Sequence, residues 1–383
     1  MKGVSPKGRK NQMLKRVQHD NKFWLSFLSS RTCFGISALG LKNLVYKAPC
    51  CRRGTLLFLF CGVLLVFSFQ SGVASQESRP GGSIVFSGLK RTYRIHIPPS
   101  HDKAKPLPLL IALHGGGGTG KAMEKLTLRG FNKLSDREGF IVVYPDGIGK
   151  HWNDGRENVK YRAHQEKIDD VGFISALIDH LGKQYNIDIK RVYVTGISNG
   201  AMMSFRLACE LSEKIAAIAP VAGSMPENLP IRCSPSRPIP VLVISNTDDR
   251  LVSWEGGDIR FGRKTFGRAL SVPETVKYWV NHNQCSSPPA ISLEPDKDPK
   301  DGTRVRKESY NQCRESSEVV LYAIEGGGHT WPGGHQYLSE WLIGKTNRDI
   351  DANEVIWDFF KRHTLRFPSP QRGEGRGEGA NTK

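Results

Sequence analysis

Apolar positions along residues 83–363 fall into short runs that alternate with longer stretches of helix-forming residues. Short segments rich in β-branched, aliphatic or aromatic residues predict strands at 83–86, 92–97, 108–113, 191–195, 238–245 and 319–324. Stretches of good helix formers predict helices at 121–137, 170–185, 199–211, 273–282 and 350–363. Because the two kinds alternate after the first pair of strands, we expect an α/β fold. It should be one doubly wound, mostly parallel sheet with helices on both faces, in a single domain over residues 80–365.

The N-terminal end of the chain departs from this pattern. Residues 55–69 form a run of about 15 apolar or small residues, preceded by Arg52 and Arg53 and followed by small residues at 71–75. A basic start, an apolar centre and a small-residue end are typical of a signal peptide, and the run is shorter than the about 20 residues of a membrane span. We therefore expect a signal peptide or an uncleaved signal anchor at 50–75, and a secreted or periplasmic protein.

Residues 1–49 and 366–383 have no periodic apolar pattern. The first stretch is basic, and we expect it to be disordered or to lie upstream of the true start; the second is a low-complexity tail. Residues 1–75 hold 12 Lys and Arg against 1 acidic residue, and residues 366–383 hold 4 against 2, which leaves +5 of the formal charge of +18 for the domain. Nucleic-acid binding needs a basic stripe on the domain itself, so we expect no nucleic-acid partner.

The sequence G-I-S-N-G at 196–200 lies between a predicted strand and a predicted helix. In that context G-x-S-x-G predicts a sharp turn that presents the hydroxyl of Ser198 at the carboxyl edge of the sheet, at the N-terminus of the next helix. A turn without chemistry is the alternative, and the flanking strand and helix argue against it. Ser198 is therefore the candidate nucleophile.

A serine nucleophile needs a base and an acid that orients the base, and in this architecture the acid and then the histidine follow the serine. The predicted strand 238–245 runs toward Asp248 and Asp249, one of which can be the acid while the other forms the turn. The predicted strand 319–324 leads into E-G-G-G-H, where three glycines give His329 a flexible approach to the serine. His329 is the candidate base, and an ordinary loop histidine is the alternative.

Two backbone amides should stabilise the oxyanion of such a reaction. One belongs to Asn199, directly after the nucleophile, and the other to the loop H-G-G-G-G-T-G at 114–120, which follows a predicted strand. Gly116 is the best single candidate in this loop, because a glycine has no Cβ to obstruct the substrate. A phosphate-binding loop is the rival interpretation, but no Gly-Lys-Ser/Thr sequence follows.

Several stretches together resemble one known family. They are L-H-G at 113–115, Y-P-D-G at 144–147 with W-N at 152–153, D-D-V-G-F at 169–173, R-V-Y-V-T-G-I-S-N-G-A-M at 191–202 and G-G-H-T-W-P-G-G at 327–334. From about residue 91 to 363 the chain resembles the secreted esterases grouped around polyhydroxybutyrate depolymerases and feruloyl esterases. The resemblance implies an α/β-hydrolase fold and a triad of Ser198, Asp249 and His329. The chain departs from the family at residues 245–246, where Ser-Asn replaces the usual His-Gly pair before the acid.

Four cysteines lie within the predicted domain, at Cys209, Cys233, Cys285 and Cys313. An even number in an exported chain favours two disulfides with three possible connectivities, and four buried free thiols are the alternative. The family resemblance implies the pairs Cys209–Cys233 and Cys285–Cys313.

Together these features predict an exported serine esterase that hydrolyses carboxylic esters through an acyl-enzyme, similar to a depolymerase of polyhydroxyalkanoate oligomers. A feruloyl or acetyl-xylan esterase is the alternative substrate class, and peptide cleavage by the same triad stays open. An inactive, membrane-tethered binding protein on the same fold is the alternative of another class.

Three tryptophans, Trp152, Trp254 and Trp331, lie in or beside the predicted catalytic loops. They either form an apolar wall for the substrate or pack inside the protein. We expect a small or oligomeric ester as the substrate, and no cofactor or metal, since His329 and His335 are not spaced as a helical ligand pair. Membrane contact is expected only through an uncleaved anchor.

Overall fold

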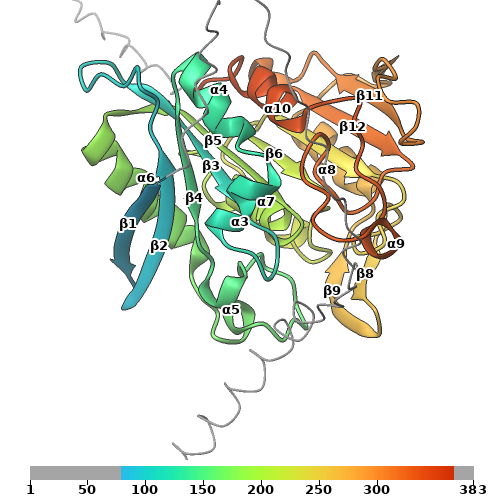
Figure 1. Cartoon of the computed structure of the whole chain (residues 1–383), viewed down its shortest axis with the longest axis horizontal. Coiled ribbons are helices and arrows are strands. Elements are labelled where there is room, and N and C mark those ends of the chain that lie inside the picture. The colour runs from blue at the N-terminus through green and yellow to red at the C-terminus, as the bar shows by residue number, and fades with distance from the viewer. Residues whose placement is uncertain (1–78, 366–383) are drawn as a thin grey trace, which may run out of the picture. The chain divides into compact units, whose positions relative to one another are not determined.

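The computed structural model describes residues 79–365, drawn in colour in Figure 1. The predicted leader at 1–49, the export signal at 50–75 and the tail at 366–383 lie outside the described residues. Within residues 79–365, no helix has the length and apolar character of a membrane span.

A ten-stranded sheet forms the centre of the described chain, in the order β1-β2-β4-β3-β5-β6-β7-β12-β11-β10. Its strands are β1 Arg79–Phe86, β2 Leu89–His96, β3 Leu107–Leu113, β4 Ile141–Pro145, β5 Ile187–Ile197, β6 Ala217–Val221, β7 Val241–Asn246, β10 Ala290–Leu293, β11 Arg304–Tyr310 and β12 Val319–Glu325. The six strands from β4 to β12 in this order are parallel, and the strands at both edges are antiparallel. Figure 1 shows β1 and β2 at one edge of the sheet and β11 and β12 toward the opposite edge, which β10 forms.

The central strands bury both of their faces, as β3 illustrates. Leu109, Ile111 and Leu113 belong to one apolar cluster, and the alternating Leu110 and Ala112 belong to a second. The first cluster includes side chains of α6 Asp170–Tyr185, α7 Asn199–Glu210 and α8 Val272–His282. The second includes side chains of α3 Gly120–Leu126, α4 Gly130–Glu138 and α10 Ala352–Phe360. A mostly parallel sheet covered by helices on both faces is the predicted α/β-hydrolase fold, which is confirmed.

The helix predicted at 121–137 is wrong in one respect, because the structure has two helices there. Leu128 and Arg129 have left-handed φ angles of 52° and 57°, which end α3 and redirect the chain before α4. The break lets Gly130 approach α10 so closely that a Cβ there would lie 2.3 Å from the side-chain nitrogen of Asn353. The sequence shows no proline at the break, so its only local signal is Gly130.

The remaining elements were not predicted from the sequence. A two-stranded hairpin, β8 Gly257–Phe261 and β9 Lys264–Ala269, lies between β7 and α8 in the chain. The short helices are α5 Arg162–Gln165 and α9 Glu340–Ile343, with 3-10 turns η2 Ile148–Lys150, η3 Pro230–Arg232 and η4 Arg314–Ser316. The buried strands β4 and β6 and the edge strands β10 and β11 were not predicted either.

Both predicted disulfides are present. Cys209–Cys233 ties α7, the helix that follows Ser198, to the loop that contains η3. Cys285–Cys313 ties the segment after α8 to the segment after β11. They close loops with sequence separations of 24 and 28 residues, so each restricts the unfolded chain as well as the folded one.

Candidate active site

Ser198 occupies the sharp turn that its motif predicts, between β5 and α7. Its backbone angles, φ 57° and ψ −117°, are strained for a residue with a side chain and cost about 1–3 kcal/mol. The flanking glycines are required by space: a Cβ on Gly196 would lie 2.7 Å from the backbone of Gly200, and one on Gly200 would lie 2.5 Å from the oxygen of Leu113. The N–H of Ser198 donates to the oxygen of Val221 on the neighbouring strand. The turn is therefore held by the sheet itself.

The histidine and one of the two candidate acids are in direct contact. His329 Nδ1 lies 2.6 Å from Asp249 Oδ2, and both side chains are only 2% exposed. The other oxygen of Asp249 accepts the backbone N–H groups of Leu251 and Val252, at 2.8 and 2.9 Å. Asp248 is exposed, and its carboxylate accepts a hydrogen bond from Thr247. Of the two candidate acids, Asp249 is therefore the one in contact with the histidine.

The loop with four glycines lies beside Ser198. A Cβ on Gly115 would be 3.5 Å from the Cβ of Ser198, and a Cβ on Gly116 would be 3.8 Å from the Cβ of Asn199. Both candidate oxyanion donors, Gly116 and Asn199, therefore belong to segments that meet next to the serine. The edge of the sheet also carries Asp249 and His329, because β5, β7 and β12 are parallel and end on the same side.

His114 holds the shape of this loop. Its Nε2 accepts the N–H of Gly147 at 3.0 Å, so Nδ1 carries the proton and donates to the oxygen of Gly115 at 2.8 Å. Burial lowers the pKa of His114 to about 4, because the charged imidazolium loses its hydration inside the protein. The indole N–H of Trp152 donates to the oxygen of His114, at 2.9 Å. A neutral histidine thus supports the glycine loop at neutral pH.

The burial of His114 predicts a pH dependence of stability. The folded-state pKa of about 4 lies below the ordinary 6.5, so between these values the unfolded chain binds a proton that the folded chain does not. The free energy of unfolding should therefore fall as the pH falls from 6.5 toward 4, with about 2.5 kcal/mol lost from this residue at pH 4.5. Urea unfolding at pH 7 and pH 4.5 measures the difference. In His114→Asn the difference in unfolding free energy between the two pH values should be smaller by about 2.5 kcal/mol. An unchanged difference contradicts the lowered pKa of His114.

Two of the three tryptophans pack inside the protein, and the third is partly exposed. Trp152 and Trp331 are completely buried, and Trp254 is partly buried against the first apolar cluster. The ring of Trp331 meets Phe131 edge to face, with centroids 5.9 Å apart. Neither of the two buried rings offers surface to a ligand in this structure.

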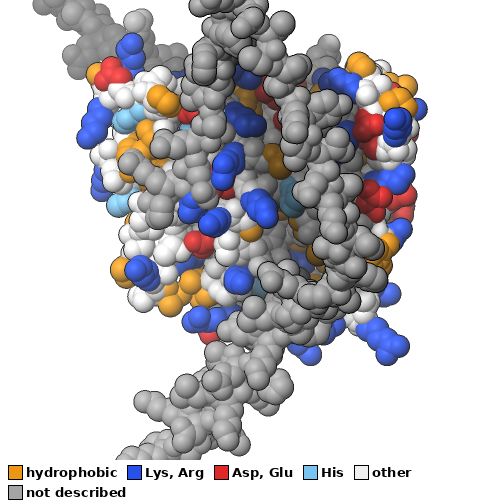
Figure 2. All heavy atoms as spheres, viewed as in Figure 1, with side chains coloured by type: hydrophobic (Ala, Val, Ile, Leu, Met, Phe, Trp, Pro, Cys, Tyr) orange, Lys and Arg blue, Asp and Glu red, His pale blue; other side chains and the backbone are white. Residues whose placement is uncertain are grey.

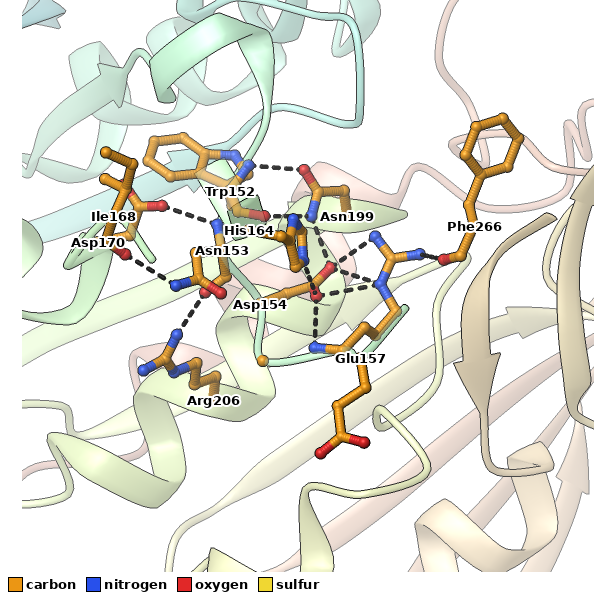
Figure 3. A network of polar contacts seen from close by, with 12 residues as sticks. Trp152, Asn153, Asp154, Glu157, His164, Ile168, Asp170, Asn199, Arg206 and Phe266 are labelled. Carbon is orange, nitrogen blue, oxygen red and sulfur yellow. Dashed lines mark hydrogen bonds and ion pairs between the residues drawn. The ribbon is translucent and has the colours of Figure 1, made fainter. Parts of the chain in front are cut away.

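The structure brings further side chains to the site that the sequence did not single out. Asp154, Arg156 and His164 form a buried cluster that contacts Asn199. Figure 3 shows Asp154 and His164 beside Asn199. Near the histidine, the hydroxyl of Tyr337 donates to the oxygen of His329 at 3.0 Å. Only Asp154 had a nearby signal, since it directly follows the W-N pair at 152–153 that carries part of the family resemblance.

Basic side chains gather in the middle of the face shown in Figure 2. Among the described residues, Arg94, Lys121 and Lys150 line a cavity of about 500 Å³ together with Gly118 and Gly147. The candidate triad does not line this cavity. Within the described part of the chain, His, Cys, Asp and Glu side chains also form no group of three that could hold a metal ion.

Comparison with known proteins identifies the family of this chain. Residues 91–227 match the sequence model of the family described as Esterase PHB depolymerase. The chain is 30% identical over 283 residues to the putative esterase NocK of Nocardia uniformis subsp. tsuyamanensis, an alignment that covers 72% of this chain and 80% of that protein. The chain belongs to this esterase family. The relatives in this family are named esterases, and this esterase is accordingly a hydrolase that acts on esters.

Other relatives of this esterase differ in length and in the substrates that their names give. It is 29% identical over 278 residues to Feruloyl esterase B of Piromyces equi, covering 71% of this chain but 45% of that protein. It is 27% identical over 302 residues to Poly(3-hydroxyalkanoate) depolymerase C of Paucimonas lemoignei, covering 73% and 67% of the two chains. Among solved structures, the acetyl xylan esterase from Aspergillus awamori is 17% identical with a TM-score of 0.48, covering 73% of this chain and 98% of that one.

Proposed function

We propose that this esterase is an exported serine hydrolase that cleaves carboxylic esters through an acyl-enzyme, with Ser198, Asp249 and His329 as its triad. The observation that carries the proposal is the buried hydrogen bond between His329 and Asp249, at the same edge of the sheet as the strained turn of Ser198. An acid that holds a histidine in one orientation is the arrangement that activates a serine nucleophile.

In the proposed mechanism, the hydroxyl oxygen of Ser198 attacks the ester carbonyl while its proton passes to Nε2 of His329. Asp249 accepts the Nδ1–H and stabilises the imidazolium that forms. The N–H groups of Gly116 and Asn199 hold the oxyanion of the tetrahedral intermediate. The imidazolium returns the proton to the leaving alkoxide, so an alcohol departs and an acyl-serine remains. Water, deprotonated by His329, then releases the acid and restores the serine.

We propose a hydroxyalkanoate oligomer as the ester. The match to the family described as Esterase PHB depolymerase supports this substrate, as does the similarity to the depolymerase of Paucimonas lemoignei. A feruloyl ester is the second candidate, because aromatic side chains lie beside the histidine loop. Tyr337 is 38% and Trp341 is 73% exposed, and the backbone oxygen of Trp341 accepts a hydrogen bond from Arg250, next to Asp249. Flat exposed rings of this kind can pack against an aromatic acid.

Export is supported by the two disulfides, since such bonds form and persist in oxidising compartments. The predicted signal at 50–75 points the same way. N-terminal sequencing of the mature protein tests the cleavage, and a protein that keeps residues 50–75 would be an anchored form.

A fluorophosphonate probe followed by a substrate panel tests the proposal. The probe should label Ser198, identified by mass spectrometry of the tryptic peptide, and the purified protein should hydrolyse p-nitrophenyl butyrate. Release of 3-hydroxybutyrate from its trimer should exceed release of ferulate from methyl ferulate in kcat/KM. Faster ferulate release assigns the second candidate instead. Absence of labelling and of ester turnover overturns the proposal in favour of an inactive binding protein, and faster cleavage of casein overturns it in favour of a peptidase.

A further inference from the structure

A fully buried carboxylate lies directly beside the nucleophile turn, and the triad does not use it. Asp154 is 0% exposed and accepts hydrogen bonds from several donors, which Figure 3 shows together. Arg156 Nε lies 3.0 and 2.9 Å from its two oxygens, and His164 Nε2 lies 3.0 Å from Oδ1. The shortest contact is with the side-chain nitrogen of Asn199, 2.6 Å from Oδ2.

The amide group of Asn199 is fully occupied by this arrangement. Its oxygen accepts the backbone N–H of Trp152 at 2.8 Å, and its nitrogen donates to the oxygen of Trp152 at 3.0 Å as well as to Asp154. One acceptor and both donor hydrogens are therefore in use, so the side chain has a single orientation. Because Asn199 is 3% exposed, water does not compete with these bonds.

The carboxylate of Asp154 stays charged because of its partners. Burial alone raises the pKa of a carboxyl group, but the charge of Arg156 and the hydrogen bond from His164 more than offset it and hold the pKa of Asp154 below its ordinary value. The side chains of Arg156 and His164 are 3% and 5% exposed, so the cluster is shielded from solvent. Hydrogen bonds to a buried charge are stronger than neutral ones, which makes the orientation of Asn199 stiff.

This stiffness acts where the proposed chemistry needs it. Asn199 is the first residue of α7, so its backbone N–H has no acceptor within the helix. Its Cα connects that N–H directly to the side chain that Asp154 holds. The preceding residue, Ser198, is in a strained conformation that persists only if its surroundings enforce it.

We propose that Asp154 is a positioning residue that, through the side chain of Asn199, aims the backbone N–H of Asn199 at the oxyanion. The inference rests on the function proposed above. Arg156 extends the cluster to the hairpin, since its NH1 donates to the oxygen of Phe266 on β9 at 2.6 Å. The segment from Trp152 to His164 is thereby clamped between the nucleophile turn and the β8–β9 hairpin.

Asn199→Ala is the primary test, because it removes the link and leaves the buried ion cluster intact. The backbone N–H of residue 199 remains, but no side chain fixes its direction. The kcat for p-nitrophenyl butyrate should therefore fall about 10- to 100-fold, with KM unchanged within twofold. This is less than the about 10²- to 10³-fold loss expected when a whole oxyanion donor is removed. The inhibition constant of phenylboronic acid, whose tetrahedral serine adduct places an oxygen in the oxyanion hole, should rise by the same factor as kcat falls.

Asn228→Ala is the matched control. Asn228 holds the same segment from another side, where its side chain donates to the oxygen of Gly155 at 3.0 Å and to Glu157 at 3.2 Å. It should leave kcat and the inhibition constant within twofold of wild type. If the role of Asn199 is purely structural, Asn199→Ala will lower the melting temperature, without an effect on kcat that is separate from KM and without a change in boronate affinity. That result overturns the proposal.

A double-mutant cycle tests whether Asp154 acts through Asn199. Asp154→Asn should lower kcat in the wild-type background, and should change it less than twofold in Asn199→Ala. Equal factors in both backgrounds overturn the proposal. Where Asp154→Asn fails to fold because Arg156 is left unpaired, the Asn199→Ala kinetics and boronate affinity decide. The proposed function has a separate test, because full activity of Ser198→Ala would refute it. If Ser198→Ala is inactive but Asn199→Ala has wild-type kinetics, only the present inference is refuted.

Discussion

Replacing Ser198 by alanine will lower kcat for p-nitrophenyl butyrate by about 10⁶-fold, because the acyl-enzyme can no longer form and only oxyanion stabilisation and substrate binding remain. The fold should persist, since Ser198 contributes its backbone to the turn through the bond from its N–H to Val221, and alanine keeps that bond. Initial rates at saturating substrate measure the loss, and thermal unfolding monitored by circular dichroism checks that the protein is folded.

Ser204→Ala is the matched control for this variant. Ser204 lies on the same helix, α7, is completely buried and donates to the backbone oxygen of Gly200 at 2.9 Å. The same atom is removed close to the same turn, yet kcat should stay within about twofold of wild type. Retention of more than a hundredth of the wild-type rate by Ser198→Ala would show that another group is the nucleophile.

The sharp turn at Ser198 could be predicted from the sequence because its causes are local. Gly196 and Gly200 are required by contacts within a few residues and with the end of β3, and a strand and a helix flank them. Four of the six parallel strands, β3, β5, β7 and β12, could be predicted for a similar reason, since strands buried on both faces are continuous apolar runs such as 108–113. The disulfide pairing followed from the family resemblance, and chain spacing alone left three connectivities.

Features that depend on contacts between distant segments could not be predicted from the residues alone. Asp248 and Asp249 have the same chemistry and adjacent positions, so the residues alone left both open as the acid and only the family resemblance favoured Asp249. In the structure the contact with His329, 80 residues later, distinguishes the two. Asp154 and Asn199 are 45 residues apart, and nothing in the sequence indicates that their side chains are in contact. The break between α3 and α4 depends on the close approach of Gly130 to Asn353, which no local pattern encodes.

Asp249→Asn will lower kcat by about 10⁴-fold, and the hydrogen bonds around Asp249 explain why. Oδ1 accepts two backbone N–H groups, from Leu251 and Val252, so the oxygen of the new amide must stay there. Its NH₂ group then faces His329 Nδ1, 2.6 Å away in the native structure, and requires that nitrogen to be an acceptor. The proton moves to Nε2, the atom that has to accept the proton of Ser198, and the imidazole becomes the wrong tautomer for a general base.

Asp248→Asn makes the same chemical change one residue earlier and serves as the control. Asp248 is exposed, and its carboxylate bonds to the hydroxyl of Thr247, so its charge is screened by water and kcat should change less than about threefold. The pH profile of kcat/KM separates the two variants further. Asp249→Asn should regain activity at high pH, where hydroxide replaces the missing base, and Asp248→Asn should keep the wild-type profile. A large loss in Asp248→Asn with a small one in Asp249→Asn would reverse the assignment of the acid, despite the contact between Asp249 and His329.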